Sequence, residues 1–129
     1  LETIRTASKE THIEITNLLI PTLNDSDEDI EKLVDFVAEL NRDIPLHFSA
    51  YRPMYKMKIE STRSETLYRA KEIAERKLNY VYLGNVPAHN DTLCPVCKNT
   101  VIKRNHNVKI NLINEKCSIC STKISIIIN

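Results

Sequence analysis

The chain has 129 residues, with 18 lysines and arginines against 17 aspartates and glutamates, and its net charge of +1 gives no overall attraction to nucleic acid or anionic membranes. No apolar run approaches the roughly 18 residues of a membrane span, and the first residues lack the apolar stretch of a signal peptide. We therefore expect a cytoplasmic protein that does not associate with membranes.

The charges are distributed unevenly along the chain. Residues 1–91 carry twelve basic and sixteen acidic side chains, whereas residues 92–129 carry six basic side chains and one acidic side chain. The net charges of the two parts are therefore −4 and +5. This asymmetry predicts two domains, residues 1–91 and residues 92–129, of which the second is too small for a large core of its own.

The amino-terminal part alternates between strand and helix patterns. The chain begins without methionine, in a segment typical of the last turns of a helix, so we interpret it as part of a longer protein. Asn24, Asp25 and Ser26 offer caps for a first full helix, and Ser64 offers a cap for a second. Hydrophobic periodicity predicts strands at residues 12–20, 45–51 and 80–83 and helices at about residues 26–41 and 64–78.

A strand-helix-strand-helix-strand order predicts an α/β fold with a parallel sheet. Alternation along the second strand directs Leu46, Phe48 and Ala50 toward the helices. The opposite face is polar, which is unusual for an open parallel sheet covered on both faces and suits a barrel whose lumen holds a polar ligand. We therefore predict a parallel βαβαβ fragment of a partial (β/α) barrel, whose other strands precede residue 1. Its polar face is expected to carry Glu14, Thr16, His47, Ser49, Tyr51, Tyr80, Tyr82 and Gly84.

Two CxxC pairs dominate the last third of the chain. Cys94 and Cys97 form the first pair, and Cys117 and Cys120 form the second, with nineteen residues between the pairs. This spacing is typical of a zinc ribbon, in which two turns supply four thiolates to one tetrahedral ion. We predict a small rubredoxin-like ribbon with strands at residues 108–113 and 124–128.

Other interpretations compete for the four cysteines. Iron accepts the same four thiolates as zinc. Two disulfides, or a thioredoxin-like redox pair at a helix start, are less favoured because nothing indicates secretion and a redox motif needs only one pair. One feature departs from the usual ribbon turn: Lys98 and Ser121 follow the pairs, where glycine is common because it adopts positive φ without cost.

Three stretches of the chain resemble a known family. They are residues 14–25 (EITNLLIPTLND), 45–53 (PLHFSAYRP) and 82–86 (YLGNV), followed by the double CxxC. Together they resemble the carboxyl-terminal half of the radical S-adenosylmethionine (SAM) enzymes of the AmmeMemoRadiSam system, which are similar to pyruvate formate-lyase activating enzymes. The resemblance implies a partial barrel whose earlier strands carry a CxxxCxxC loop. That loop binds a [4Fe-4S] cluster, which cleaves SAM reductively.

The CxxxCxxC loop is absent here, so we expect this chain to be inactive by itself and to have no catalytic residue of its own. Its implied partner is the missing amino-terminal barrel half, and the resemblance also allows a protein substrate. By resemblance, Thr16 and Asn17 approach SAM, and Tyr51 and Arg52 lie near its adenosine. An arginine at position 52 departs from the expected histidine but can bind the carboxylate of SAM. His47 and Ser49 are the other two residues of this chain that we expect to contact the ligand in the barrel lumen.

A second function of a different class also fits the sequence. The chain would then be a stand-alone interaction module, with a zinc ribbon that binds protein or RNA and an α/β part that acts as scaffold. Residues 92–129 contain no Phe, Tyr or Trp. Because binding of single-stranded nucleic acid depends on aromatic stacking, we do not expect a nucleic-acid partner.

Overall fold

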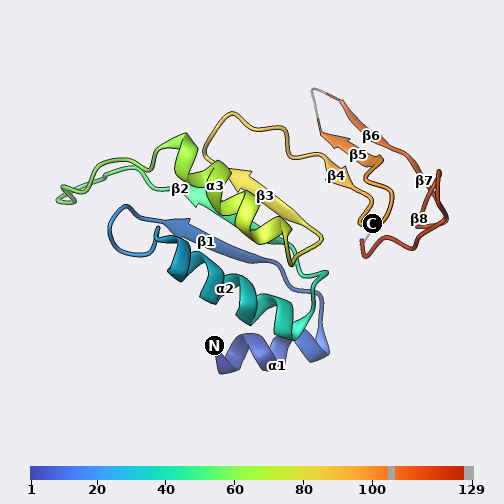
Figure 1. Cartoon of the computed structure of the whole chain (residues 1–129), viewed down its shortest axis with the longest axis horizontal. Coiled ribbons are helices and arrows are strands. Elements are labelled where there is room, and N and C mark those ends of the chain that lie inside the picture. Colours follow the sequence, from blue (N-terminus) through green and yellow to red (C-terminus); the bar gives the residue numbers. More distant parts are fainter. Residues whose placement is uncertain (105–106, 127–129) are drawn as a thin grey trace. The chain divides into compact units, whose positions relative to one another are not determined.

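The computed structural model describes residues 1–104 and 107–126. They belong to two compact units, a first unit (Leu1–Ala88) and a second unit (His89–Asn129), whose elements are labelled in Figure 1. None of the helices in the described ranges has the length and apolar character needed to cross a bilayer.

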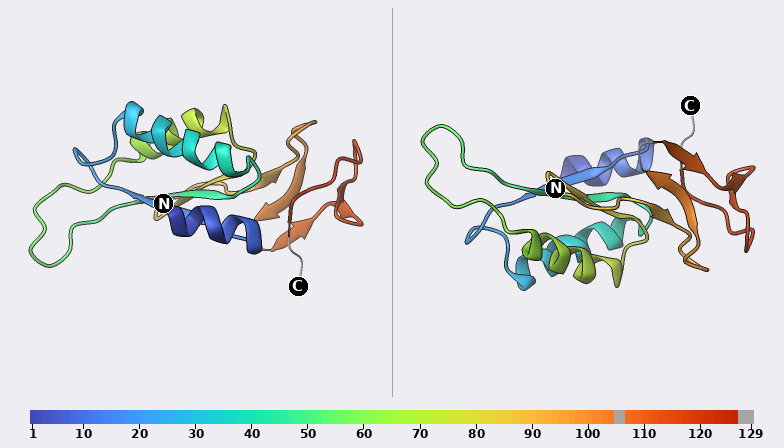
Figure 2. Two further views of the ribbon diagram at one scale, coloured as in Figure 1. Left: turned by 90° about the horizontal axis from the view of Figure 1, so that it is seen from below. Right: turned by 90° about the horizontal axis from the view of Figure 1, so that it is seen from above.

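The first unit is built on a three-stranded parallel sheet with the order β1-β2-β3. Its strands are β1 (Ile15–Leu19), β2 (Leu46–Ala50) and β3 (Val81–Gly84), and Leu46 of the central strand is in register with Ile15 and Val81. Helices α2 (Asp27–Leu40) and α3 (Ser64–Glu75) follow β1 and β2 and lie on the same face of the sheet (Figure 2). The predicted α/β class with a parallel sheet is confirmed.

The first helix, α1 (Glu2–Glu10), has no fully buried residue. It contacts α2 through Arg5, whose guanidinium lies 5.0 Å from the centre of the Phe36 ring. The same side chain reaches Glu39, with an N–O distance of 3.6 Å. Because the Arg5 side chain is 43% exposed, these two contacts contribute little to the stability of the fold.

Helix α2 begins as the sequence predicts, but α3 does not. The Ser26 hydroxyl accepts a hydrogen bond from the N–H of Asp29 at 3.2 Å and caps α2. The expected cap at Ser64 is wrong, because Ser64 is already the first residue of α3 and the N-cap is Arg63, which makes no side-chain cap bond. A backbone hydrogen bond from Thr66 N–H to Arg63 C=O closes the first turn instead.

Strands β1 and β2 and helix α3 are shorter than predicted, whereas β3 (Val81–Gly84) is only shifted by one residue. Strand β1 begins at Ile15 rather than residue 12, and α3 ends at Glu75 rather than residue 78. Tight i→i−3 backbone bonds at Arg76 and Lys77 end the regular helix. Leu78 nevertheless remains in the core, with only 3% of its surface exposed.

The core lies between the sheet and the two helices that cover it. The three inward residues of β2 are at most 4% exposed, as their alternation predicts. The buried cluster consists of Leu19, Ile30, Val34, Val37, Ile44, Leu46, Phe48, Ala50, Leu67, Ala70, Ile73, Ala74, Leu78, Val81 and Leu83. Because the cluster lies on the helix side, the opposite face of the sheet carries mainly polar side chains, together with Leu18, which is 42% exposed.

On that opposite face, Gly84 allows two strands to fit closely. A Cβ atom at position 84 would lie 2.5 Å from the Ser49 hydroxyl oxygen, which is closer than real Cβ contacts. The sole glycine of the chain therefore accommodates the Ser49 side chain of the neighbouring strand. A ligand approaching the sheet here would meet Ser49 beside the glycine.

The second unit contains two small antiparallel sheets. The first has the order β4-β5-β6, with β4 (Thr92–Leu93), β5 (Thr100–Arg104) and β6 (Val108–Ile110), and the second pairs β7 (Leu112–Ile113) with β8 (Lys116–Cys117). The predicted strand at residues 108–113 is thus divided at Asn111, whose N–H donates to Val101 C=O at 2.8 Å. Of the predicted strand at 124–128, residues 124–126 are not in a strand, and 127–128 lie outside the described residues.

The loop before α3 is tied to the carboxyl ends of β1 and β2 by Thr62. Its hydroxyl donates to Leu19 C=O at 2.6 Å and accepts from Tyr51 N–H at 2.9 Å. The N–H of Thr62 also donates to Tyr51 C=O at 3.0 Å. Since Thr62 is only 8% exposed, water has little access to replace these bonds.

Replacing Thr62 with valine keeps the shape but leaves Leu19 C=O and Tyr51 N–H without this hydroxyl partner. We predict that Thr62→Val lowers the free energy of unfolding by about 1 to 3 kcal/mol, measured by urea denaturation. The exposed neighbour Ser61 provides a matched control, since Ser61→Ala should change the free energy of unfolding by less than about 0.5 kcal/mol. Equal stabilities of the two variants would contradict this role of Thr62.

Candidate metal centre

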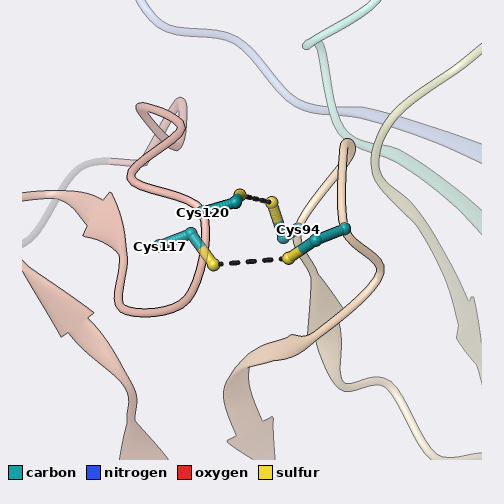
Figure 3. A group of neighbouring side chains, drawn as sticks. Cys94, Cys117 and Cys120 are labelled. Atoms are coloured by element: carbon teal, nitrogen blue, oxygen red, sulfur yellow. Dashed lines mark hydrogen bonds between the residues drawn. The ribbon is translucent and has the colours of Figure 1, made fainter.

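The four cysteines predicted as ligands converge on one point of the second unit (Figure 3). Their sulfur atoms all lie within 4.8 Å of one another. The Cys94 and Cys120 sulfurs are 3.5 Å apart, and the Cys97 and Cys117 sulfurs are 3.6 Å apart. Four sulfurs placed tetrahedrally at about 2.3 Å from an ion would be about 3.8 Å apart. The arrangement therefore matches a four-thiolate metal site.

The two CxxC segments form equivalent turns. In the first turn, Lys98 N–H donates to Cys94 C=O at 3.0 Å, and Cys94 N–H donates to Asn99 C=O at 2.8 Å. The second turn repeats both bonds, from Ser121 to Cys117 at 2.9 Å and from Cys117 to the residue after Ser121 at 2.8 Å. Each turn directs its two sulfurs toward the other turn.

Both turns need a left-handed residue directly after the second cysteine. Lys98 and Ser121 each have a φ of 59°. This is the region that glycine adopts without steric cost and that other residues enter at a cost of about 1 kcal/mol. The departure from glycine noted in the sequence therefore leaves the turn geometry intact and reduces its stability.

The surroundings of the sulfurs stabilise negative charge unequally. The hydroxyl of Thr122, 3.2 Å from the Cys120 sulfur, and then its N–H lower the pKa of Cys120 to about 6. The N–H groups of Cys120 and Ile119 lower the pKa of Cys117. The N–H of Asn99 acts in the same direction on Cys97, but burial and hydrogen bonds with the other sulfurs raise its pKa to about 12.

The close spacing of the four sulfurs indicates what the cluster needs. Four thiolates this close repel one another, so they ionise together only around a cation. Thiolate sulfur is a soft ligand that selects zinc or iron over magnesium or calcium. Four sulfur ligands also fill a tetrahedral coordination sphere, which leaves no position for a reacting water and is typical of a structural ion.

The alternatives to a metal find less support. All four cysteines are free, and their sulfur separations exceed the 2.05 Å or so of a disulfide bond. A thioredoxin-like CxxC pair lies at the start of a helix, and the described part of the second unit contains no helix. The residues present fit a four-thiolate metal site best.

The structure brings only some of the other predicted site residues together. We call the face of the sheet opposite α2 and α3 the uncovered face. On it, Thr16 is in register with His47, and Ser49 follows His47 two residues later. Asn17 instead lies on the helix-covered face, in register with Phe48, and its side-chain oxygen has no partner among the described residues. One ligand on the uncovered face would therefore contact Thr16, His47 and Ser49 without Asn17.

At the carboxyl end of β2, Tyr51 and Arg52 have different environments. Tyr51 was expected on the polar face, but it lies beyond the end of the strand and is 7% exposed, and its hydroxyl is unpartnered within the described ranges. Arg52 is exposed, and its guanidinium donates to Asn85 C=O at 3.5 Å. Of these two residues, only Arg52 is accessible to an anionic group that approaches from solvent.

A cluster that the sequence did not reveal lies on the uncovered face. The Glu14 carboxylate accepts a hydrogen bond from the His47 ring at 2.8 Å and lies 3.5 Å from His12. The His47 ring is 5.2 Å from that of Tyr82. Alternation placed Glu14 and His47 on one face, but their pairing depends on the register between β1 and β2, which periodicity within a single strand does not determine.

Comparisons with known proteins give one match. No family model and no solved structure matches the chain. The chain is 41% identical over 138 aligned positions to "Uncharacterized protein MJ0808" of Methanocaldococcus jannaschii, and the match covers 99% of this chain and 41% of that protein. The chain thus spans about two-fifths of the length of the curated relative it matches.

The Glu14 cluster predicts a dependence of stability on acid pH. Partial burial acts to raise the pKa of Glu14, but hydrogen bonds and charge from His47 and His12 lower it below the usual value of a glutamate. A carboxyl with a depressed pKa stabilises the fold above its unfolded pKa and loses this contribution as pH falls through the folded value. Because Glu14 is half exposed, the contribution is below about 1 kcal/mol.

We therefore predict that Glu14→Gln is less stable than the natural chain at pH 7 and equally stable near pH 2.5, in urea unfolding. Glu10→Gln, at an exposed position in α1, is the control and should have no effect at either pH. A Glu14→Gln deficit that persists in acid would show that the ion-pair account is wrong.

The left-handed residues of the two turns provide a test of the metal centre's construction. We predict that Lys98→Gly and Ser121→Gly each raise the free energy of unfolding of the metal-loaded chain by about 0.5 to 1 kcal/mol, because glycine removes the cost of positive φ. Ser118→Gly is the matched control, since Ser118 does not have positive φ, and it should bring no gain. Guanidinium denaturation monitored by metal release measures all three.

Proposed function

We propose that the second unit is a rubredoxin-like zinc ribbon that holds one structural zinc or iron ion through Cys94, Cys97, Cys117 and Cys120. The convergence of the four sulfurs carries this proposal. The unit also needs such an ion, because few of its described residues are buried: Thr92, Cys94, Val101, Ile102, Cys117 and Ile124. A core of this size supplies little folding free energy, which a bound metal would add.

We further propose that the chain is the carboxyl-terminal part of a radical SAM enzyme. Support comes from the family resemblance and from a parallel sheet with α2 and α3 on one face and mainly polar residues on the other. Within the described residues, β1 and β3 each pair with only one strand, so the sheet can extend at both sides into a partial barrel. The greater length of the Methanocaldococcus relative is compatible with such a barrel.

In this proposal the rest of the protein supplies the [4Fe-4S] cluster, which generates a radical from SAM when both are bound. The role of this chain is to bind and orient. The exposed guanidinium of Arg52 can hold a carboxylate through paired hydrogen bonds. The side chains of Thr16, His47 and Ser49 offer donors and acceptors to a polar ligand on the uncovered face. A protein substrate is compatible with the similarity to activating enzymes.

One observation favours the second candidate, a stand-alone interaction module. Several aliphatic side chains of the second unit are more than 60% exposed: Val96, Val108, Ile113 and Ile119. Exposed apolar groups of this kind are typical of surfaces that bind another protein. The presence or absence of an iron–sulfur cluster in the longer protein separates the two candidates.

The test is metal and acid-labile sulfide analysis of this chain and of the natural full-length protein, both purified without oxygen. We predict one zinc or iron without sulfide in the chain, and about four additional irons with about four sulfides in the full-length protein. A full-length protein without labile sulfide would refute the proposal of a radical SAM enzyme. The interaction module would then be the better-supported candidate.

A paired variant separates the two metal sites. In the full-length protein, replacing Cys97 and Cys120 with serine should remove the ribbon ion and leave the sulfide content unchanged. Loss of sulfide in this variant would contradict the assignment of all four cysteines to the ribbon.

A further inference from the structure

Lysines of the second unit face one another across neighbouring strands at two places. Lys103 of β5 is directly opposite Lys109 of β6, and Lys116 of β8 forms an antiparallel bridge with Lys123. All four side chains are exposed. Residues directly opposite in an antiparallel pair have Cβ atoms about 4.5 to 5.5 Å apart, where like charges destabilise the pairing. The unit therefore keeps two unfavourable charge pairs on a small scaffold.

No ion pair among the described residues neutralises these lysines. The ion pairs found among the described residues all lie in the first unit, and none includes a lysine of the second unit. The second unit has only two acidic residues, Asp91 and Glu115. The Asp91 carboxylate accepts a hydrogen bond from the backbone N–H of Arg104 at 2.7 Å. The positive charge on β5 and β6 is thus available to an external partner.

Protection of the sheet edge does not explain the Lys103–Lys109 pair. A lysine on an edge strand prevents unwanted pairing with other chains, and β6 is an edge of the sheet β4-β5-β6 formed by the described residues. Lys109 alone would serve that purpose. Lys103 lies on the central strand β5, where it protects no edge and only adds repulsion.

The two sides of β6 differ in chemistry. Its three residues, Val108, Lys109 and Ile110, are all exposed, and their side chains alternate between the faces of the sheet. The face of Lys109 also carries Lys103, whereas Val108 and Ile110 lie on the other face and are 65% and 50% exposed. Arg104, opposite Val108, is on this second face, but its guanidinium donates hydrogen bonds to Asn90 C=O and the Thr92 hydroxyl. An extended segment paired with β6 would therefore meet positive charge on one side and aliphatic surface on the other.

We infer that β6 is a docking edge for an extended protein segment in which acidic and aliphatic residues alternate. The segment adds as a strand, its carboxylates lie beside Lys103 and Lys109, and its aliphatic side chains contact Val108 and Ile110. Nucleic acid offers the same negative charge, but it would find no Phe, Tyr or Trp for base stacking in residues 92–129. This inference is independent of the proposed enzyme, because it concerns only the ribbon surface.

The test uses the zinc-loaded chain and three labelled probes in fluorescence anisotropy. The probes are a ten-residue peptide of alternating Glu and Val, the same peptide with Gln in place of Glu, and oligouridine of matched charge. We expect the Glu peptide to bind most tightly and its affinity to fall as salt is added. Equal binding of the Glu and Gln peptides, or tighter binding of oligouridine, would overturn the inference.

Charge reversal locates the surface. Lys103→Glu combined with Lys109→Glu should weaken binding of the Glu peptide by at least about tenfold. Lys56→Glu combined with Lys58→Glu makes the same change of charge at exposed positions of the first unit and should leave the affinity unchanged. Equal effects of the two double variants would mean that only net charge matters and would overturn the proposed site.

A single variant excludes unfolding as the cause of lost binding. Lys103→Glu replaces the repulsion with an attraction to Lys109, so it should raise the melting temperature while it weakens peptide binding. A lower melting temperature, or unchanged affinity, would contradict the inference.

Discussion

The convergence of four cysteine sulfurs is the constraint on which the second unit depends. Each of the two turns that carry the sulfurs begins at a buried cysteine, since Cys94 and Cys117 are 0% and 2% exposed. Only short strands connect the turns. With so small an apolar core, an ion bound by the four sulfurs would add much of the folding free energy available to the unit. Coordination would also offset the cost of the non-glycine residues at positive φ, Lys98 and Ser121.

In the first unit, the apolar core between the sheet and the helices determines how these elements pack. Polar residues then lie on the other face of the sheet. Phe48 is fully buried at the centre of the sheet, and α2 and α3 cover only the side on which it lies. Glu14, His47 and Tyr82 are then left on the uncovered face, where hydrogen bonding and ring contact organise them. A polar, preorganised face on a parallel sheet is a suitable wall for a polar ligand.

Sequence reasoning succeeded where a local pattern determines the structure. The alternation around Phe48 predicted the buried face, and the cysteine spacing predicted the sulfur cluster. It failed where the outcome depends on contacts between distant segments or on competing local bonds. The pairing of Glu14 with His47 requires the register between two strands, and the start of α3 at Ser64 depends on a backbone bond to Arg63 that replaces a side-chain cap.

X-ray absorption spectroscopy at the zinc and iron edges tests the central claim most directly. The account predicts one metal ion per chain, surrounded by four sulfur atoms at about 2.3 Å and by no lighter ligand. A metal with nitrogen or oxygen ligands, or a chain whose cysteines are oxidised to disulfides and bind no ion, would contradict it.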